Sequence, residues 1–246
     1  MHKVMFVLLA SLASLSAFAD ATIDRLQNLA QPQFRLLSED LGAILSYKPL
    51  SPGETLGVSG FDFGVEITGT TFNNKEVINA ATSGNAPSLL PVPKLHAHKG
   101  LPFGFDVGLV YAGVPNSNIN LLGGELRYAI LEGGIATPAI ALRGSYTKLS
   151  GVDQLGFDTK GLDISISKGF AVAKPYAGIG RVWVNSTPNL PPSATPQGSI
   201  ALKNESFTLP KVFVGVNLNF AVTNLAFEAD RTGDATSYGA KVGWRF

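Results

Sequence analysis

The sequence predicts an all-β membrane protein, a ten-stranded antiparallel transmembrane β-barrel with a short N-terminal helical segment. Three observations predict it. Residues 237–246 alternate between apolar and polar side chains and end on an aromatic residue. Alternation of this kind recurs in earlier runs, as lipid on one face and a polar lumen on the other require. Apolar residues make up 45% of the chain and charged residues only 15%, which is low for a soluble domain.

The N-terminus has the features of an export signal, so residues 1–19 are predicted to be a signal peptide. A short basic start precedes an apolar run over residues 4–15, and Ala17-Phe18-Ala19 fits the small-residue cleavage pattern. The run is too short to span a membrane comfortably. The chain contains no Cys, which excludes disulfides and thiolate metal sites.

The charge balance argues against nucleic acid as a partner. Without residues 1–19, which contain one Lys, 18 basic residues face 18 acidic ones. A nucleic acid or another acidic polymer would require a basic field. The sequence also shows no phosphate-binding glycine loop, nucleophile elbow or zinc motif, so no cofactor is expected.

Residues 20–54 differ from the rest of the chain. Phe34, Leu37, Leu41 and Leu45 recur at helical spacing, and the polar residues 38–40 lie between them. An alternating strand over residues 41–47 is the competing interpretation, and the helix is favoured. We therefore predict residues 20–54 to be a helical segment, either periplasmic or plugging the barrel, and residues 55–246 to be the barrel.

Ten alternating runs follow, and the lengths of their connections support the count. The runs cover residues 61–68, 90–98, 103–112, 119–131, 138–149, 157–168, 172–185, 206–219, 222–231 and 236–246. Connections assigned to one rim, such as 99–102 and 220–221, are short. The opposite rim receives both long connections, 73–88 and 186–205. Short turns at one rim and longer loops at the other are typical of outer-membrane barrels.

The alternation also assigns the charged side chains of the strands to the lumen, because a charge on the lipid face costs about 2–4 kcal/mol at mid-membrane. The predicted lumen residues, structural or pore-lining, are Asp62, Glu66, Asp106, Glu125, Arg127, Arg143, Asp163, Arg181, Glu228, Asp230, Lys241 and Arg245. Acids and bases are close in number, which allows an ion-pair network. Such pairs either fill a narrow barrel or line a selective pore or ligand site.

Two histidines, His96 and His98, fall on one face of a predicted strand. Two such rings can bind a metal ion, but no third ligand stands at a diagnostic spacing, so no metal site is predicted. A catalytic role for either histidine with an unidentified serine would suit a lipid-modifying barrel. No serine stands in a recognisable nucleophile context, so no catalytic residue is assigned.

Four stretches resemble an uncharacterised family of proteobacterial outer-membrane β-barrel proteins. They are Ser38-Glu39-Asp40-Leu41-Gly42, Lys99-Gly100-Leu101-Pro102-Phe103, residues 125–134 and residues 232–238. The Trp244-Arg245-Phe246 terminus also resembles the assembly signal of Gram-negative outer-membrane barrels, with Trp244 and Phe246 as its aromatic residues. The resemblance implies location in the cell outer membrane.

The function expected from these features is that of a non-enzymatic, porin-like outer-membrane barrel, with a narrow channel for small solutes as the leading hypothesis. The alternatives are a lipid-modifying acyl hydrolase or transferase and a purely structural or adhesive barrel. The expected partners are outer-membrane lipid, the barrel assembly machinery and a small-molecule solute.

Overall fold

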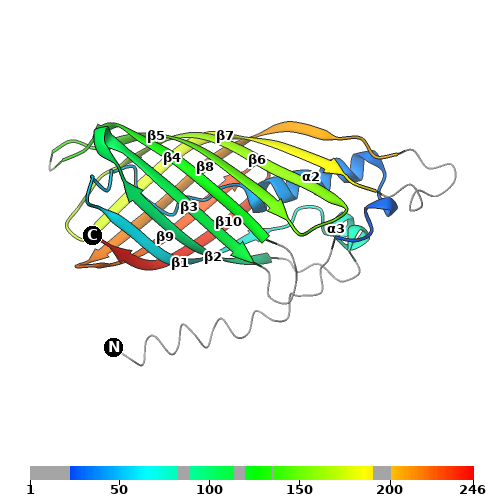
Figure 1. Cartoon of the computed structure of the whole chain (residues 1–246), viewed down its shortest axis with the longest axis horizontal. Helices are drawn as coiled ribbons and strands as arrows, with labels where there is room; N and C mark the ends of the chain where they lie inside the picture. Colours follow the sequence, from blue (N-terminus) through cyan, green and yellow to red (C-terminus); the bar gives the residue numbers. More distant parts are fainter. Residues whose placement is uncertain (1–22, 83–88, 114–119, 135, 191–200) are drawn as a thin grey trace, which may run out of the picture.

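Ten antiparallel strands close into a barrel, in which every strand pairs with its neighbours in the chain and β1 pairs with β10 (Figure 1). The computed structural model describes residues 23–82, 89–113, 120–134, 136–190 and 201–246, so the predicted signal peptide lies outside the described residues. The strands are β1 Phe61–Thr71, β2 Leu89–Gly100, β3 Phe105–Gly113, β4 Asn120–Glu132, β5 Ala139–Ser150, β6 Leu155–Ser167, β7 Ala173–Pro188, β8 Glu205–Phe220, β9 Thr223–Thr232 and β10 Ala235–Arg245. The predicted fold is confirmed, and most predicted strands match within three residues.

The two ends of the barrel differ as the connections predict. We call the end that carries Phe246 the C-terminal rim; the described turns there are short, as at residues 168–172 and 221–222. The opposite end, the loop rim, receives the long connections 72–88 and 189–204. The chain reverses tightly between β2 and β3, where Phe103 and Gly104 both adopt positive φ, 63° and 76°.

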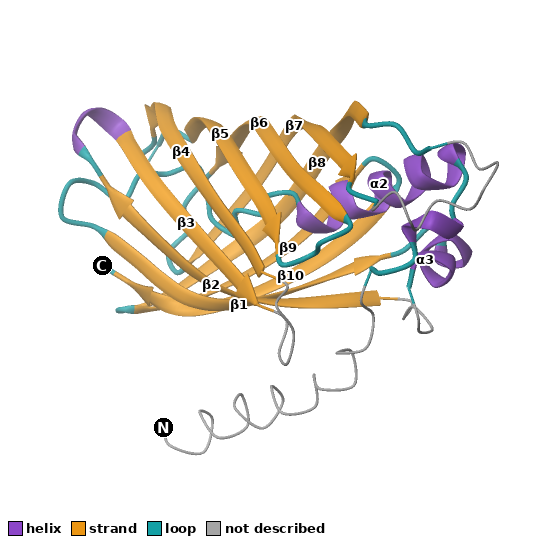
Figure 2. Ribbon diagram, turned by 45° about the vertical axis from the view of Figure 1, so that its right-hand side comes forward, coloured by secondary structure: helices purple, strands orange, loops and turns teal. Residues whose placement is uncertain are grey.

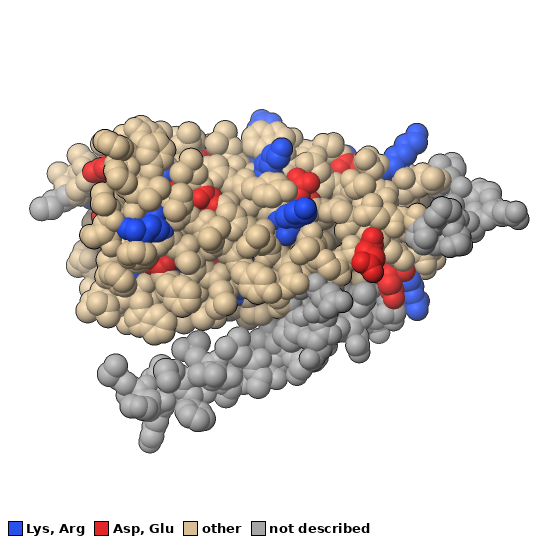
Figure 3. Space-filling view, in the orientation of Figure 1, with Lys and Arg blue, Asp and Glu red and all other residues tan. Residues whose placement is uncertain are grey.

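The outer surface of the barrel is apolar between two groups of aromatic side chains. Alternate strand residues such as Leu109, Ile179 and Val214 point outward and are exposed. Exposed aromatics gather at the C-terminal rim: Phe61, Phe103, Phe170, Phe220, Trp244 and Phe246. Others, Tyr111, Tyr146, Trp183 and Tyr238, lie nearer the loop rim. On the face seen in Figure 3, charged side chains are few and scattered. A closed barrel with an apolar belt and aromatic girdles is an integral outer-membrane β-barrel.

Two α-helices lie toward the loop rim (Figure 2). Helix α2, Gln31–Leu45, is the helix that the apolar spacing predicts. Helix α3, Lys75–Ala81, lies in a connection predicted to be irregular, so that expectation was wrong. Its buried face, Val77, Ile78 and Ala81, packs with the short 3-10 helix η2, Leu26–Asn28, and this tertiary contact stabilises a segment too short to be helical alone. No helix in the described part of the chain is long and apolar enough to cross a membrane.

Helix α2 sits inside the barrel, and the chain after it runs through the lumen to the C-terminal rim before entering β1 (Figure 1). We call residues 46–60 the inner segment, and residues 31–60 the plug. Residues 40–53 are all buried. The plug therefore lies within the barrel. Its helix lies at the loop rim, because the apolar wall that can cover Phe34 and Leu37 is there.

Candidate functional site: the barrel lumen

The half of the lumen toward the loop rim is apolar on the side formed by β3 to β8. Phe34, Leu37 and Leu41 of α2 form one buried cluster with wall side chains that point inward from β3 to β8, including Val182, Val184 and Leu209. The helix lies close to this wall at Gly42, where a Cβ would stand 2.7 Å from a Val184 methyl carbon. Hydroxyl groups meet beside it, since Ser38 Oγ donates to Ser186 Oγ at 2.9 Å.

The half toward the C-terminal rim is polar, and its wall bonds to the backbone of the inner segment. Arg127 donates from Nη2 and Nε to Asp106 Oδ2, at 2.8 and 3.1 Å, and from Nη1 to the carbonyl of Pro52 at 2.6 Å. Asp106 Oδ1 accepts the amide hydrogen of Leu56 at 3.1 Å. An extended chain buried in the lumen has no secondary structure to pair its backbone groups, and these side chains supply the partners.

A second ion-pair cluster joins the middle of the plug to β8 and β9. Lys48 Nζ lies 2.8 Å from Asp230 Oδ1 and also donates to the Ala43 carbonyl at the end of α2, at 2.9 Å. Lys211 Nζ donates to the Tyr47 carbonyl at 2.6 Å and lies 3.7 Å from Asp230 Oδ2. Burial lowers the pKa of the Lys48 amine to about 8, although Asp230 opposes this shift. The plug thus supplies a cation to a wall carboxylate.

Further buried pairs follow the wall itself. Arg143 Nη2 lies 2.6 Å from Asp163 Oδ1, and its Nη1 lies 3.6 Å from Glu125 Oε2. Lys94 pairs with Glu66 at 3.2 Å and Lys241 with Asp62 at 2.9 Å. In addition, Tyr176 donates to Glu228 at 2.9 Å. These contacts place acids and bases of seven strands in the desolvated lumen as separate pairs and one three-residue cluster.

The structure places most of the predicted lumen residues inside. Those that are buried there are Asp62, Glu66, Asp106, Glu125, Arg127, Arg143, Asp163, Glu228, Asp230 and Lys241. Arg245 is half-buried at the C-terminal rim, on the inward face of β10.

Arg181 is on the wrong face in our assignment, because it is exposed on the outside of β7. Inward positions of this strand are Tyr176, Gly178, Gly180 and Val182. A Cβ at Gly178 would collide with the inward Phe213 ring, so this inward position of β7 requires glycine. A long arginine side chain on the outer face can extend its guanidinium toward the polar interface.

The sequence assignment missed the lumen cations Lys48, Lys94 and Lys211. Lys211 stands next to Pro210 in β8, and only the alternation continuing through Phe213 and Gly215 would have placed it inside. Lys48 carries no such signal, since it lies outside the strands.

The sequence matches no protein-family model and no curated protein. The solved structures to which the chain is similar include the following three. The KdgM porin in complex with disordered oligogalacturonate is 10% identical, covers 76% of this chain and 99% of that chain, and gives a TM-score of 0.38. OprG from Pseudomonas aeruginosa is 12% identical, covers 80% and 99%, and gives 0.37. The toluene transporter TbuX of Ralstonia pickettii is 10% identical, covers 83% and 93%, and gives 0.28.

Proposed function

We propose that this outer-membrane barrel is a non-enzymatic narrow channel for small solutes, closed at rest by its own plug. The observation that carries the proposal is the path of residues 31–60, which pass through the lumen from one rim to the other and bond to its wall along the way. A wall of charged side chains behind a removable segment is suited to small polar solutes once that segment moves.

The sidedness of the channel follows from the rims. We infer that the C-terminal rim faces the periplasm, since short turns lie on that side in outer-membrane barrels. Helix α2 then closes the external mouth. Trp244 and Phe246, both exposed, would be read by the assembly machinery at the periplasmic side, and the apolar belt between the aromatic girdles would contact lipid.

The geometry gives less support to a lipid-modifying enzyme. The hydroxyl that contacts His98 is that of Tyr47, at 3.2 Å, and not a serine. Both histidines are buried beneath the plug, where an acyl chain in the membrane does not reach. A purely structural barrel is the alternative that the experiment must separate from a channel.

The test is conductance in planar bilayers with a plug that can be locked. The chain has no Cys, so Ser38→Cys with Ser186→Cys introduces a single crosslink between α2 and β7. Deletion of residues 31–57 removes all but the last three residues of the plug. We expect the deletion to raise conductance, and the oxidised crosslink to abolish any openings of the full chain until a reductant is added.

The matched control is Thr70→Cys with Ser237→Cys, whose hydroxyl oxygens are also 2.9 Å apart but belong to the paired strands β1 and β10. Its oxidation should leave conductance unchanged. Heat-modifiable migration on a denaturing gel establishes that each variant is a closed barrel. A deletion variant that folds and conducts no better than the full chain would contradict the channel proposal and favour a purely structural barrel.

A further inference from the structure

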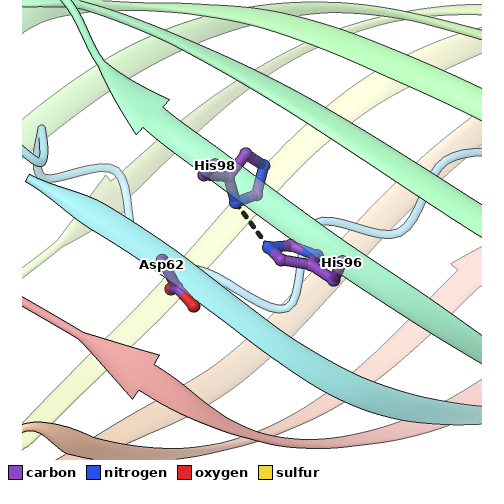
Figure 4. Close-up of side chains that lie close together, drawn as sticks. All are labelled: Asp62, His96 and His98. Carbon is purple, nitrogen blue, oxygen red and sulfur yellow. Dashed lines mark hydrogen bonds between the residues drawn. The ribbon is translucent and has the colours of Figure 1, made fainter.

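Strand pairing brings a third ligand to the two histidines of the lumen. His96 and His98 point inward from β2, and Asp62 of β1 stands directly opposite His98 in the register (Figure 4). On its other side His98 faces Gly108 of β3, where a Cβ would collide with the imidazole ring. One ligand atom from each of Asp62, His96 and His98 lies within 4.8 Å of the others, and all three side chains are buried.

The outward nitrogen of each histidine faces a buried carboxylate. His98 Nε2 lies 2.8 Å from Glu125 Oε1, and His96 Nδ1 lies 3.4 Å from Glu66 Oε2. A carboxylate only accepts hydrogen bonds, so each contact favours a hydrogen on the histidine nitrogen that faces it. Tyr47 can then accept from His98 Nε2 as well.

With the hydrogens placed there, the other nitrogen of each ring carries no hydrogen. His96 Nε2 and His98 Nδ1 face one another at 2.5 Å, with the Asp62 carboxylate beside them. Two lone pairs directed at each other next to an anion repel unless a proton or a metal ion binds both nitrogens. A proton fits the observed distance, whereas a tetrahedral ion with bonds of about 2.0 Å holds its two nitrogen ligands about 3.3 Å apart, so the rings must separate to admit it. Lys241 binds Asp62 Oδ2 at 2.9 Å, while Oδ1 has only a long contact of 3.3 Å from Asn224. Oδ1 therefore keeps a lone pair for a cation.

We propose that Asp62, His96 and His98 bind a divalent transition-metal ion of the zinc class within the lumen wall. Two imidazole nitrogens and one carboxylate oxygen are ligands that such ions prefer, and three protein ligands leave one position of a tetrahedral ion for water. Glu66 and Glu125 orient the two rings through their outer nitrogens, which is the usual outer-shell arrangement of metal-bound histidine.

The charges around the cluster are already paired. Glu66 faces Lys94, Asp62 faces Lys241, and Glu125 lies 3.6 Å from Arg143, which also binds Asp163. The charge balance therefore does not select the occupant, and the proposal rests on the two facing nitrogens and the Asp62 oxygen beside them. A shared proton between the rings is the competing occupant, and the experiment distinguishes the two.

The experiment folds the chain from residue 20 onward, without a histidine tag, from urea into detergent micelles in the presence of Co²⁺ or Zn²⁺. Folding with the metal present removes slow entry into a buried site as an explanation for a negative result. Beyond the predicted signal peptide the only histidines are His96 and His98, so every imidazole signal comes from this pair. Free metal is removed by gel filtration, and bound metal is counted by mass spectrometry.

We expect one ion per folded chain, a Co²⁺ spectrum of a tetrahedral site with nitrogen ligands, and displacement of Co²⁺ by Zn²⁺. His96→Gln, or His98→Gln if the first variant does not fold, should abolish binding. Glu66→Gln should weaken binding about 10- to 100-fold, as expected for loss of an outer-shell partner. The control is Glu228→Gln, a buried lumen carboxylate that bonds to Tyr176 and not to the cluster; it should bind as the unaltered chain does.

Two results would overturn the proposal. Folded wild-type chain that retains no metal after folding with Zn²⁺ would assign the cation between the rings to a proton. Equal metal content in the wild type and the His96→Gln variant would show adventitious binding elsewhere. Neither result bears on conductance, so the metal-site proposal and the channel proposal are tested independently.

Discussion

The two halves of the lumen hold the same chain by different means. Toward the loop rim the plug is helical, and the wall that covers its apolar face, from β3 to β8, is mainly aliphatic. Toward the C-terminal rim the plug is extended, and the wall presents Arg127, Asp106 and Lys211 to its backbone. A helix satisfies its own backbone groups and needs only apolar cover, whereas an extended chain in a buried lumen needs side chains as partners.

The character of the wall therefore follows the conformation of the chain it encloses. Apolar contact is not directional, so the contacts of α2 hold the plug in the lumen without fixing the position of each residue. Charged hydrogen bonds fix positions, so the polar half sets the path of the inner segment. At Leu50 the path even requires positive φ, 41°, and Gly239 of the wall leaves room for the displaced side chain, 3.0 Å from where a Cβ would stand.

The largest effect is expected in the polar half. Arg127→Met leaves the buried Asp106 carboxylate without its cation, and breaking a buried pair in this way costs about 3–5 kcal/mol. We expect the free energy of unfolding, measured by urea in detergent micelles, to fall by that amount. Adding Asp106→Asn removes the stranded charge and should restore at least half of the loss. If the double variant is as unstable as the single one, the contacts of Arg127 with the inner segment matter more than its ion pair.

A smaller effect is expected in the apolar half. Leu37→Ala removes a buried side chain from α2, and we expect the free energy that holds this helix in the lumen to fall by about 2 kcal/mol. This is the lower end for such a change, because a helix at the end of the barrel can shift to fill the space. The loss should appear as faster hydrogen exchange of residues 31–45 with little change in unfolding of the barrel. Leu36→Ala is the matched control, since Leu36 is exposed on the same helix. Loss of barrel stability in Leu37→Ala would show that helix and wall form one cooperative unit.

The strands could be predicted from the sequence because lipid and lumen impose a two-residue period on them. Residues such as Phe105 to Tyr111 show it without interruption. The prediction failed for Arg181 because the rule that charges face inward was given priority over the space needed beside Phe213. Helix α3 was missed since its stability comes from contact with residues distant in sequence.

The site was harder to predict than the fold. The pairing of Asp62 with His98 depends on the register of β1 and β2, which no local spacing reveals. Lys48 was missed for a similar reason: its role depends on the plug's path through the lumen, and the sequence left open whether residues 20–54 lie inside or outside. Periodicity assigns faces, whereas contacts across the lumen follow from closure of the barrel.

The smallest effect concerns pH and the junction of the two halves. Lys48, at the end of α2, has its pKa lowered from 10.5 to about 8 by burial, with Asp230 opposing and Lys211 nearby. The released segment therefore binds more protons than the seated one between these values, and seating should become more favourable as pH rises from about 8 to 10.5. Protection of the plug from a broad-specificity alkaline protease would measure this, with Lys48→Met as the control that lacks the titrating group. The pKa of about 8 already includes the opposing effect of the Asp230 ion pair, so the sign of the expected change does not depend on that pair. Protection that instead falls over this range in the wild type, but not in Lys48→Met, would mean that the ion pair outweighs the cost of burying the charge, and that the polar half governs attachment as well as register.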